Sequence, residues 1–211
     1  MKRPLGPSLA LSLLILSAAP AFAQVHGALN EARVVPVNGR LGAGYLQFDK
    51  SSATLMGQLR LSFYPNLDFG FLGGLSRVDV GNDTQTSLRL ASDFRGQLAV
   101  QGTSFPVNVV LGGTVGVESA DDFTILSVGP TVVASRQLDA AGQWMGYGGA
   151  SLLLSRVEVK SVRDTDTSFP VRAGLEFLPN RDLRLLAEAQ IAISDNIRDD
   201  FSFTLGALFP F

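Results

Sequence analysis

The sequence predicts an all-β protein, an antiparallel up-and-down transmembrane β-barrel of about ten strands, with eight strands as the alternative. Three observations predict this fold. Apolar and polar residues alternate with a period of two over long stretches, which is typical of a sheet with two unlike faces. Only 17% of the 211 residues are charged although 46% are hydrophobic, whereas soluble domains carry about 25% charged residues. The first residues also have the pattern of an export signal.

Residues 1–23 contain the three parts of a signal peptide. Lys2 and Arg3 form a positive start, residues 9–19 are apolar, and a small-x-small cleavage site ends at Ala23. The apolar run is shorter than the ~20 residues of a spanning helix, which disfavours a retained anchor. We therefore expect cleavage after Ala23. The expected organisation is a signal peptide (1–23), a periplasmic N-terminal segment (24–38) and an outer-membrane β-barrel (39–211).

The strands are located by their alternation. In residues 86–101 the apolar side chains stand at even positions, as with Leu88 and Leu90, and the polar ones at odd positions, as with Arg89 and Asp93. Most such segments exceed the ~5–6 residues typical of soluble strands and suit the ~9–11 tilted residues that cross a bilayer. The predicted strands are 40–48, 53–64, 67–79, 86–101, 105–117, 122–134, 143–158, 168–178, 182–193 and 200–211.

The connections between these strands alternate in character. One set consists of turns such as Tyr64-Pro65-Asn66 and Pro179-Asn180-Arg181. The other set is polar and mostly acidic, as expected for loops at the outer surface of the cell. An even number of strands returns both termini to the periplasmic side. The loops of the second set are predicted at 50–52, 81–84, 118–121, 160–167 and 194–199.

Strand parity also predicts a register for the hairpin around Pro179. The apolar residues are odd-numbered on both sides of this turn, so directly opposed residues have an even sum. A sum of 360 pairs Phe177 with Leu183. It also sets two pairs of opposite charge face to face, which are Glu176 with Arg184 and Arg172 with Glu188.

Alternation alone does not say which face is inside, because a soluble lipocalin-like barrel has its apolar face inside and a membrane barrel has it outside. After residue 23 the only lysines are Lys50 and Lys160, both in predicted loops, whereas soluble sheet edges are rich in Lys. Aromatic residues also gather at strand ends on the apolar face, as in membrane barrels. We therefore expect the polar face to line the lumen. The predicted lumen cluster is Arg60, Arg89, Asp93, Arg95, Arg172, Glu176, Arg184 and Glu188.

This lumen cluster supports two interpretations. Charges inside a low-dielectric wall must be paired or hydrated, and the balance of signs favours ion pairs that keep a narrow barrel closed. The alternative is a small water-filled pore whose selectivity is set by its arginines. Ten strands lie between filled eight-stranded barrels and open porins, so the size of the barrel does not decide between them.

Several segments together resemble the small outer-membrane β-barrel domain family, of the OmpA/OmpX-like kind. They are the export signal, the strand Gly39-Arg40-Leu41-Gly42-Ala43-Gly44-Tyr45, the turn Phe63-Tyr64-Pro65-Asn66-Leu67 and the final alternating strand ending on Phe211. The resemblance covers most of the chain after the signal peptide. It implies that the last strand, with Phe203, Phe209 and Phe211, is an assembly signal for the barrel-assembly machinery. The short predicted outer loops differ from those of family members that act as adhesins.

Residue types disfavour an enzyme. The chain has no Cys and a single His, His26, which lies outside every predicted strand, so a Ser-His-Asp triad or a thiolate mechanism has no base or nucleophile. We expect no cofactor and no metal, and read the acidic pairs at 121–122 and 199–200 as loop charge. The net charge of −2 offers no footprint for nucleic acid. The expected partners are outer-membrane lipid and the assembly machinery.

The sequence thus predicts a non-enzymatic envelope protein, structural or interaction-bearing, with a largely closed lumen. Two alternatives remain: a narrow solute or ion channel of the outer membrane, and a soluble periplasmic lipocalin-like binding barrel.

Overall fold

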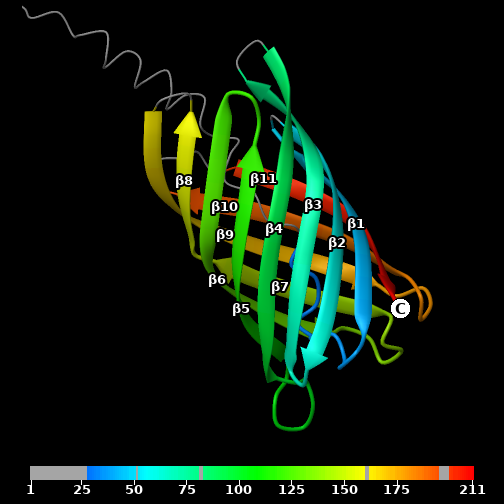
Figure 1. The fold of residues 1–211 in the computed structure, drawn as a ribbon. Helices are drawn as coiled ribbons and strands as arrows, with labels where there is room; N and C mark the ends of the chain where they lie inside the picture. The colour runs from blue at the N-terminus through cyan, green and yellow to red at the C-terminus, as the bar shows by residue number, and fades with distance from the viewer. Residues whose placement is uncertain (1–27, 51, 81–82, 160–161, 195–199) are drawn as a thin grey trace, which may run out of the picture.

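The structure is a computed structural model that describes residues 28–50, 52–80, 83–159, 162–194 and 200–211. The predicted signal peptide and His26 lie outside these described residues. Within them the chain is all β (Figure 1). The strands are β1 (Arg40–Asp49), β2 (Ser52–Tyr64), β3 (Leu67–Val80), β4 (Asp83–Ala99), β5 (Asn108–Ser119), β6 (Phe123–Gln137), β7 (Trp144–Ser151), β8 (Leu153–Val159), β9 (Val162–Phe177), β10 (Arg184–Ser194) and β11 (Asp200–Pro210).

The strands form one closed antiparallel barrel. Except for β7 and β8, each strand pairs with its neighbours in sequence, and β11 pairs with β1 to close the cylinder. β7 and β8 both lie between β6 and β9 and together make up one strand of the wall. The predicted ten-stranded up-and-down barrel is therefore confirmed, with one of its ten strands interrupted.

The interruption at Leu152 has a local cause. Pro130 of β6 lies opposite Leu152, whose N–H donates to the Pro130 carbonyl at 3.1 Å, and Pro170 of β9 lies next to the same point on the other side. A proline has no N–H to give to a sheet ladder. Two prolines flanking one position break the pairing there, while the register stays the same on both sides of the break.

The barrel has two distinct ends. We call the end that carries residues 36–39 and Phe211 the terminal end. The strands at this end are joined by the Tyr64–Leu67 turn and by loops 100–107, 138–143 and 178–183. At the Tyr64–Leu67 turn Asn66 has a φ of 60°, which suits the Pro-Asn pair of a type II turn. The connections at the opposite end are short.

The structure corrects several details of the predicted strands. β5 continues to Ser119 and β9 begins at Val162, so half of the loop predicted at 118–121 and most of the loop predicted at 160–167 are strand. β5 begins at Asn108 rather than at 105. In the β9–β10 hairpin Phe177 faces Leu185, so the predicted even parity is right, but the register is displaced by two residues. The loop 178–183 is longer than the three-residue turn that we predicted.

The loop between β6 and β7 is organised by Asp139. Its carboxylate accepts the backbone N–H of Trp144 at 2.8 Å and that of Gln143 at 3.2 Å. These bonds, the one from Trp144 above all, hold the pKa of Asp139 below the usual 3.8. The loop thereby positions Trp144 at the start of β7, where its ring packs on that of Phe177 with ring centroids 4.7 Å apart.

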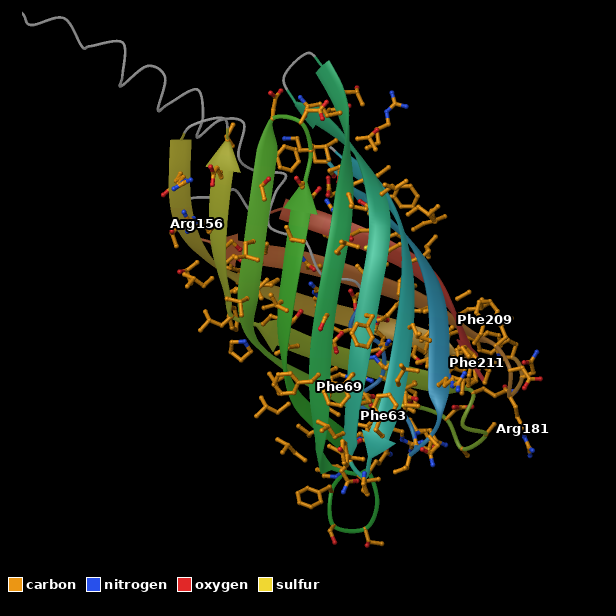
Figure 2. All side chains as sticks on the ribbon, in the orientation of Figure 1. Phe63, Phe69, Arg156, Arg181, Phe209 and Phe211 are labelled. Atoms are coloured by element: carbon orange, nitrogen blue, oxygen red, sulfur yellow. The ribbon has the colours of Figure 1, made fainter. Side chains whose placement is uncertain are left out.

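The outer face of the barrel is apolar. Leu55, Leu75, Leu98 and Ile193 are each more than half exposed, and many side chains project outward from the wall that faces the viewer in Figure 2. Phenylalanines gather outside the terminal end, where Phe63, Phe69, Phe209 and Phe211 are labelled in Figure 2. The lipocalin-like alternative requires the apolar face inside, and the structure has the opposite arrangement.

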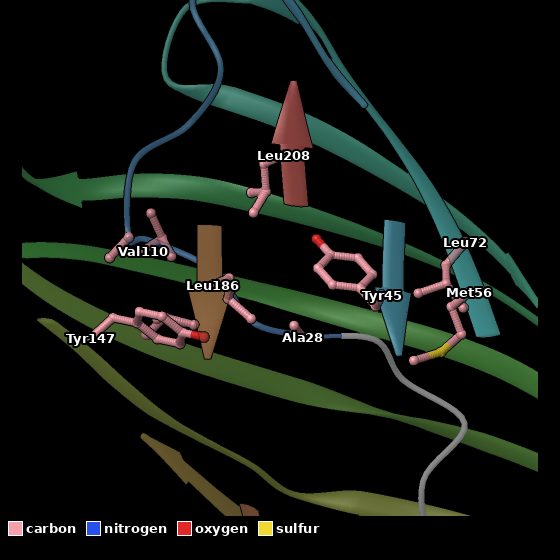
Figure 3. Packing of buried hydrophobic residues seen from close by; sticks show 10 residues of the cluster. Ala28, Tyr45, Met56, Leu72, Val110, Tyr147, Leu186 and Leu208 are labelled. Carbon is pink, nitrogen blue, oxygen red and sulfur yellow. The ribbon is translucent and has the colours of Figure 1, made fainter. Parts of the chain in front are cut away.

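The inner face combines polar groups with an apolar cluster at mid-height. This cluster contains two tyrosines, Tyr45 and Tyr147 (Figure 3). Each of them lies over a glycine of the neighbouring strand. Tyr45 faces Gly206 and Tyr147 faces Gly174 in the strand pairing. A Cβ on either glycine would overlap the tyrosine ring. The two glycines therefore make the room in which the rings lie flat against the wall.

Replacing Gly206 with Ala should destabilise the barrel, by about 1–3 kcal/mol, because overpacking forces the Tyr45 ring out of its position. The measurement is the urea midpoint of unfolding in lipid vesicles. Gly44→Ala is the matched control, since a Cβ there meets nothing within 4 Å. Equal effects of the two substitutions would contradict the packing described here.

Candidate functional site: the lumen and the segment inside it

One polar cluster in the lumen joins β2, β3 and β4. Asp68 accepts from Arg60 at 2.5 Å and from Arg95 at 3.0 Å, and Arg60 also pairs with Asp93. Gly70 makes the last contact possible, because it lies between Arg60 and Asp93 in the strand pairing and a Cβ there would overlap both groups. Two arginines and two carboxylates thus form one continuous network on the wall.

A second cluster lies on β9 and β10. Arg172 lies 3.8 Å from the Glu188 carboxylate and Arg184 lies 3.7 Å from that of Glu176. These are the two pairs of opposite charge that the sequence predicted, but they form diagonally because the register is displaced by two residues. Diagonal neighbours on one face remain within reach of long side chains. Across Gly174, Tyr147 donates its hydroxyl to Glu188 at 3.0 Å.

A third pair lies nearer the opposite end of the barrel. Arg89 of β4 and Glu118 of β5 face each other in register and lie 3.0 Å apart, fully buried. Ser87 donates to the same carboxylate at 2.5 Å. Burial of an ion pair is favourable only when the geometry and the added hydrogen bonds are good, and the serine supplies one such bond.

Residues 28–35 lie inside the barrel. A turn from Pro36 to Gly39 leads from this segment into β1, with the Gly39 N–H donating to the Pro36 carbonyl at 2.7 Å and Asn38 at a φ of 62°. Ala28 lies at mid-height among the apolar cluster (Figure 3). The described part of the segment expected at 24–38, residues 28–38, therefore runs along the inside of the wall as far as this turn.

The barrel holds the segment through side chains that bind its backbone N–H groups. Three carboxylates accept from it: Glu188 from Leu29 at 2.9 Å, Glu176 from Glu31 at 2.5 Å and Asp68 from Val35 at 2.9 Å. Ser135 and Gln97 accept from the N–H groups of residues 32 and 34, each at 3.0 Å. Buried backbone N–H groups need partners, and here the wall supplies them.

Arg95 and Gln97 bind the carbonyl side of the segment. The Arg95 guanidinium donates to the carbonyl of Leu29 at 3.3 Å, to that of Glu31 at 3.1 Å and to that of Arg33 at 3.1 Å. It also donates to the side-chain oxygen of Asn30 at 2.8 Å. Gln97 donates to the carbonyl of residue 32 at 3.1 Å. One arginine thus links the wall network to successive residues of the segment.

Little space is left between the wall and the segment at Ala28 and Leu29. A cavity of about 50 Å³ remains next to Ala28 and Leu29, bordered by Arg60, Arg95 and Arg172. Since a buried water needs at least about 10–15 Å³ of such volume, this is room for only a few waters. A pocket of about 410 Å³ lies on the other side of the segment, at the terminal end.

The sequence missed three carboxylates of these clusters. Asp68 lies at an even position of β3, on the same face as Leu72 and Ser76. The alternation along this strand could therefore have placed its side chain in the lumen. Glu118 was assigned to a loop, whereas parity along the longer β5 puts it in the lumen. Glu31, which pairs with Arg184, lies outside the strands, so strand alternation gives no prediction for it.

The eight predicted lumen residues all lie in the three clusters: Arg60, Asp93 and Arg95 in the first, Arg172, Glu176, Arg184 and Glu188 in the second, and Arg89 in the third.

Two of the three residues of the predicted assembly signal lie on the outer face of β11. Phe203 and Phe209 point outward, and Phe211 follows the strand at the terminal end. The backbone of Phe211 exchanges two hydrogen bonds with Arg40, at 3.0 and 3.2 Å. The last residue thereby pairs with the start of the first strand.

Within the described ranges, His, Cys, Asp and Glu form no group of three or more that could hold a metal ion. The same residues contain no helix that is long and apolar enough to cross a membrane.

Comparisons with known proteins gave solved structures only. No protein-family model matches the chain, and no curated protein sequence matches it. An outer membrane channel from Pseudomonas putida F1 is 12% identical, with 88% of this chain and 100% of that one covered and a TM-score of 0.48. The N-terminal β-barrel domain of Pseudomonas aeruginosa OprF is 10% identical, with 83% and 98% covered and a TM-score of 0.39. The KdgM porin is 8% identical, with 81% and 99% covered and a TM-score of 0.40.

Replacing Arg60 with Ala should destabilise the barrel strongly, by about 3–5 kcal/mol, because it leaves Asp68 with one arginine and Asp93 with none of the partners named here. Urea unfolding in vesicles measures the change. Arg181→Ala is the control, since Arg181 is exposed in the loop 178–183 and surface changes of this kind stay within about 0.5 kcal/mol. A small effect of Arg60→Ala would mean that the network does not hold the wall together.

Proposed function

We propose that the protein is a non-enzymatic integral barrel of the outer membrane, structural or interaction-bearing, whose lumen is kept closed by its own residues 28–35. The terminal end faces the periplasm in this proposal, and the short connections of the opposite end face outward. The observation that carries the proposal is the set of hydrogen bonds by which lumen side chains bind the backbone of the segment.

The distribution of apolar surface supports the membrane. Large apolar side chains cover the outside of the wall while the ion pairs lie inside. A soluble protein with such a surface would aggregate, since exposed apolar patches of more than a few hundred Å² mark interaction or membrane surfaces. Export through residues 1–23 is part of the proposal, and it is the route by which such a barrel reaches the outer membrane.

Two features support a closed lumen. The wall carboxylates that bind the segment are themselves paired with arginines, so the segment completes a network that already exists. The cavity of about 50 Å³ next to Ala28 and Leu29 is too small for a hydrated ion path, and the larger pocket of about 410 Å³ lies at the terminal end of the segment.

A narrow channel is the second candidate, and one observation favours it. The bonds described above reach residues 29–35 from side chains of the wall, in contrast to the backbone ladders that join the strands. A segment held in this way can leave without breaking the barrel, and an arginine-lined passage would then open.

Unmodified protein in planar bilayers should show no steady conductance, whereas Ala32→Trp should conduct. Ala32 is fully buried in the lumen cluster, and a tryptophan there overpacks the space and displaces the segment. Val37→Trp is the matched control, because Val37 is 46% exposed in the turn that follows the segment, and this variant should stay closed. Steady conductance of the unmodified protein would contradict the proposed closure and favour the channel.

Deleting Phe211 should lower the amount of inserted protein, because it removes both the terminal aromatic residue and the two backbone bonds to Arg40. Insertion is measured as the carbonate-resistant, heat-modifiable fraction of the membrane pellet. Deleting the ring alone with Phe211→Ala separates the aromatic signal from the backbone bonds. Unchanged insertion of both variants would remove the assembly role of this residue, and release of the unmodified protein by carbonate would refute the membrane location itself.

A further inference from the structure

The lumen holds the segment at two arginines in a way that resembles the binding of a ligand. On the wall, Arg95 forms an ion pair with Asp68. The other hydrogen bonds of Arg95 named above go to acceptors of the segment. These acceptors are the carbonyl oxygens of Leu29, Glu31 and Arg33 and the amide oxygen of Asn30. All four oxygens leave Arg95 when the segment leaves.

Arg184 holds the only carboxylate that the segment contributes to these clusters. Its guanidinium pairs with Glu31, and on the wall it lies 3.7 Å from Glu176. Glu31 therefore presents a carboxylate to Arg184 and a carbonyl oxygen to Arg95 at the same time. One residue of the segment thus bridges the two arginines.

Both arginines border the pocket of about 410 Å³ at the terminal end, beside Pro36 and Phe211. This pocket lies next to the segment, so the space that the segment vacates would be continuous with it. The two guanidinium groups would then face one open volume.

The partners that the wall loses show what a replacement ligand would have to supply. The wall itself is neutral, because Arg60, Arg95, Arg172 and Arg184 stand against Asp68, Asp93, Glu176 and Glu188. The segment presents one carboxylate to it, that of Glu31 on Arg184, while the cation of the segment, Arg33, is exposed. The wall carboxylates each lose an N–H donor when the segment leaves, but Asp68, Glu176 and Glu188 keep an arginine partner. Arg95 likewise keeps its two bonds to Asp68, but it loses four acceptors whereas each carboxylate loses one donor.

We propose that Arg95 and Arg184 form a binding site for a small monocarboxylate that carries further oxygen acceptors, and that residues 29–33 occupy this site as an internal substitute for it. The carboxylate of the ligand takes the place of the Glu31 side chain on Arg184. Its hydroxyl or carbonyl oxygens replace the segment's acceptors on Arg95. The proposal rests on the proposed closure of the lumen by residues 28–35, and it makes the ligand a competitor of the segment.

The test uses the absence of cysteine from the chain. Ala32→Cys places one thiol on the fully buried face of the segment, and Val37→Cys places one at an exposed position. With the full chain in vesicles, maleimide should label Ala32→Cys at least about tenfold more slowly than Val37→Cys, because labelling requires the segment to open. Sodium gluconate should raise the rate at Ala32→Cys severalfold, and uncharged glucose should not.

Substitutions identify the site. Arg95→Gln or Arg184→Gln, combined with Ala32→Cys, should abolish the response to gluconate, whereas Arg181→Gln should leave it intact. In open Ala32→Trp channels, gluconate added at the terminal side should block the chloride current. Arg95→Gln should raise the half-blocking concentration by roughly tenfold or more, as expected for the loss of a charged hydrogen bond.

The outcomes separate the two proposals. Slow labelling of Ala32→Cys that gluconate does not change, or block that survives Arg95→Gln, overturns the carboxylate site and leaves the closure intact. Labelling of Ala32→Cys as fast as Val37→Cys refutes the closure. The unmodified channel is then open as isolated, and gluconate block of its current, with and without Arg95→Gln, tests the carboxylate site directly.

Discussion

The pairing of charge inside the barrel is the constraint on which the rest of the structure depends. The outer face is apolar, so the polar face of the strands has to lie inside, where an unpaired charge costs several kcal/mol. Asp68 shows how the constraint is met, because it serves Arg60 and Arg95 together and also accepts from the N–H of Val35. The same groups that stabilise the wall therefore also bind the segment in its lumen.

The glycines of the inner face determine where such contacts can form. Gly70 and Gly174 each lie between two strands whose side chains meet across them, Arg60 with Asp93 in one case and Tyr147 with Glu188 in the other. A larger residue at either position would separate the two partners. The polar network is thus specified by small residues as much as by the charged residues that form it.

Much of the barrel could be predicted because strand parity is a local property of the sequence. Alternation alone indicated the number of strands and the face on which each predicted charge lies. Alternation did not predict the register of the β9–β10 hairpin or the position of residues 28–35, because each depends on contacts outside the strand itself. The register of the β9–β10 hairpin depends on the length of the loop after Phe177, and that loop is held by the bond from the Leu178 N–H to the Gln143 carbonyl of another loop. Residues 28–35 have no periodicity, and their place depends on side chains such as Arg95 that are distant in sequence.

The way the segment joins the wall has a consequence for how the barrel is built. The turn at Pro36–Gly39 connects it to β1, and β1 is one of the two strands that meet at the seam of the cylinder, where Arg40 pairs with Phe211. The segment precedes every strand in the chain, so the inward groups of β3, β4, β9 and β10 can gather around it while the seam is still open. If the pairing of β11 with β1 forms last, it closes the cylinder and encloses residues 28–35 in the same step, and these residues then act as a template for the inside of the barrel.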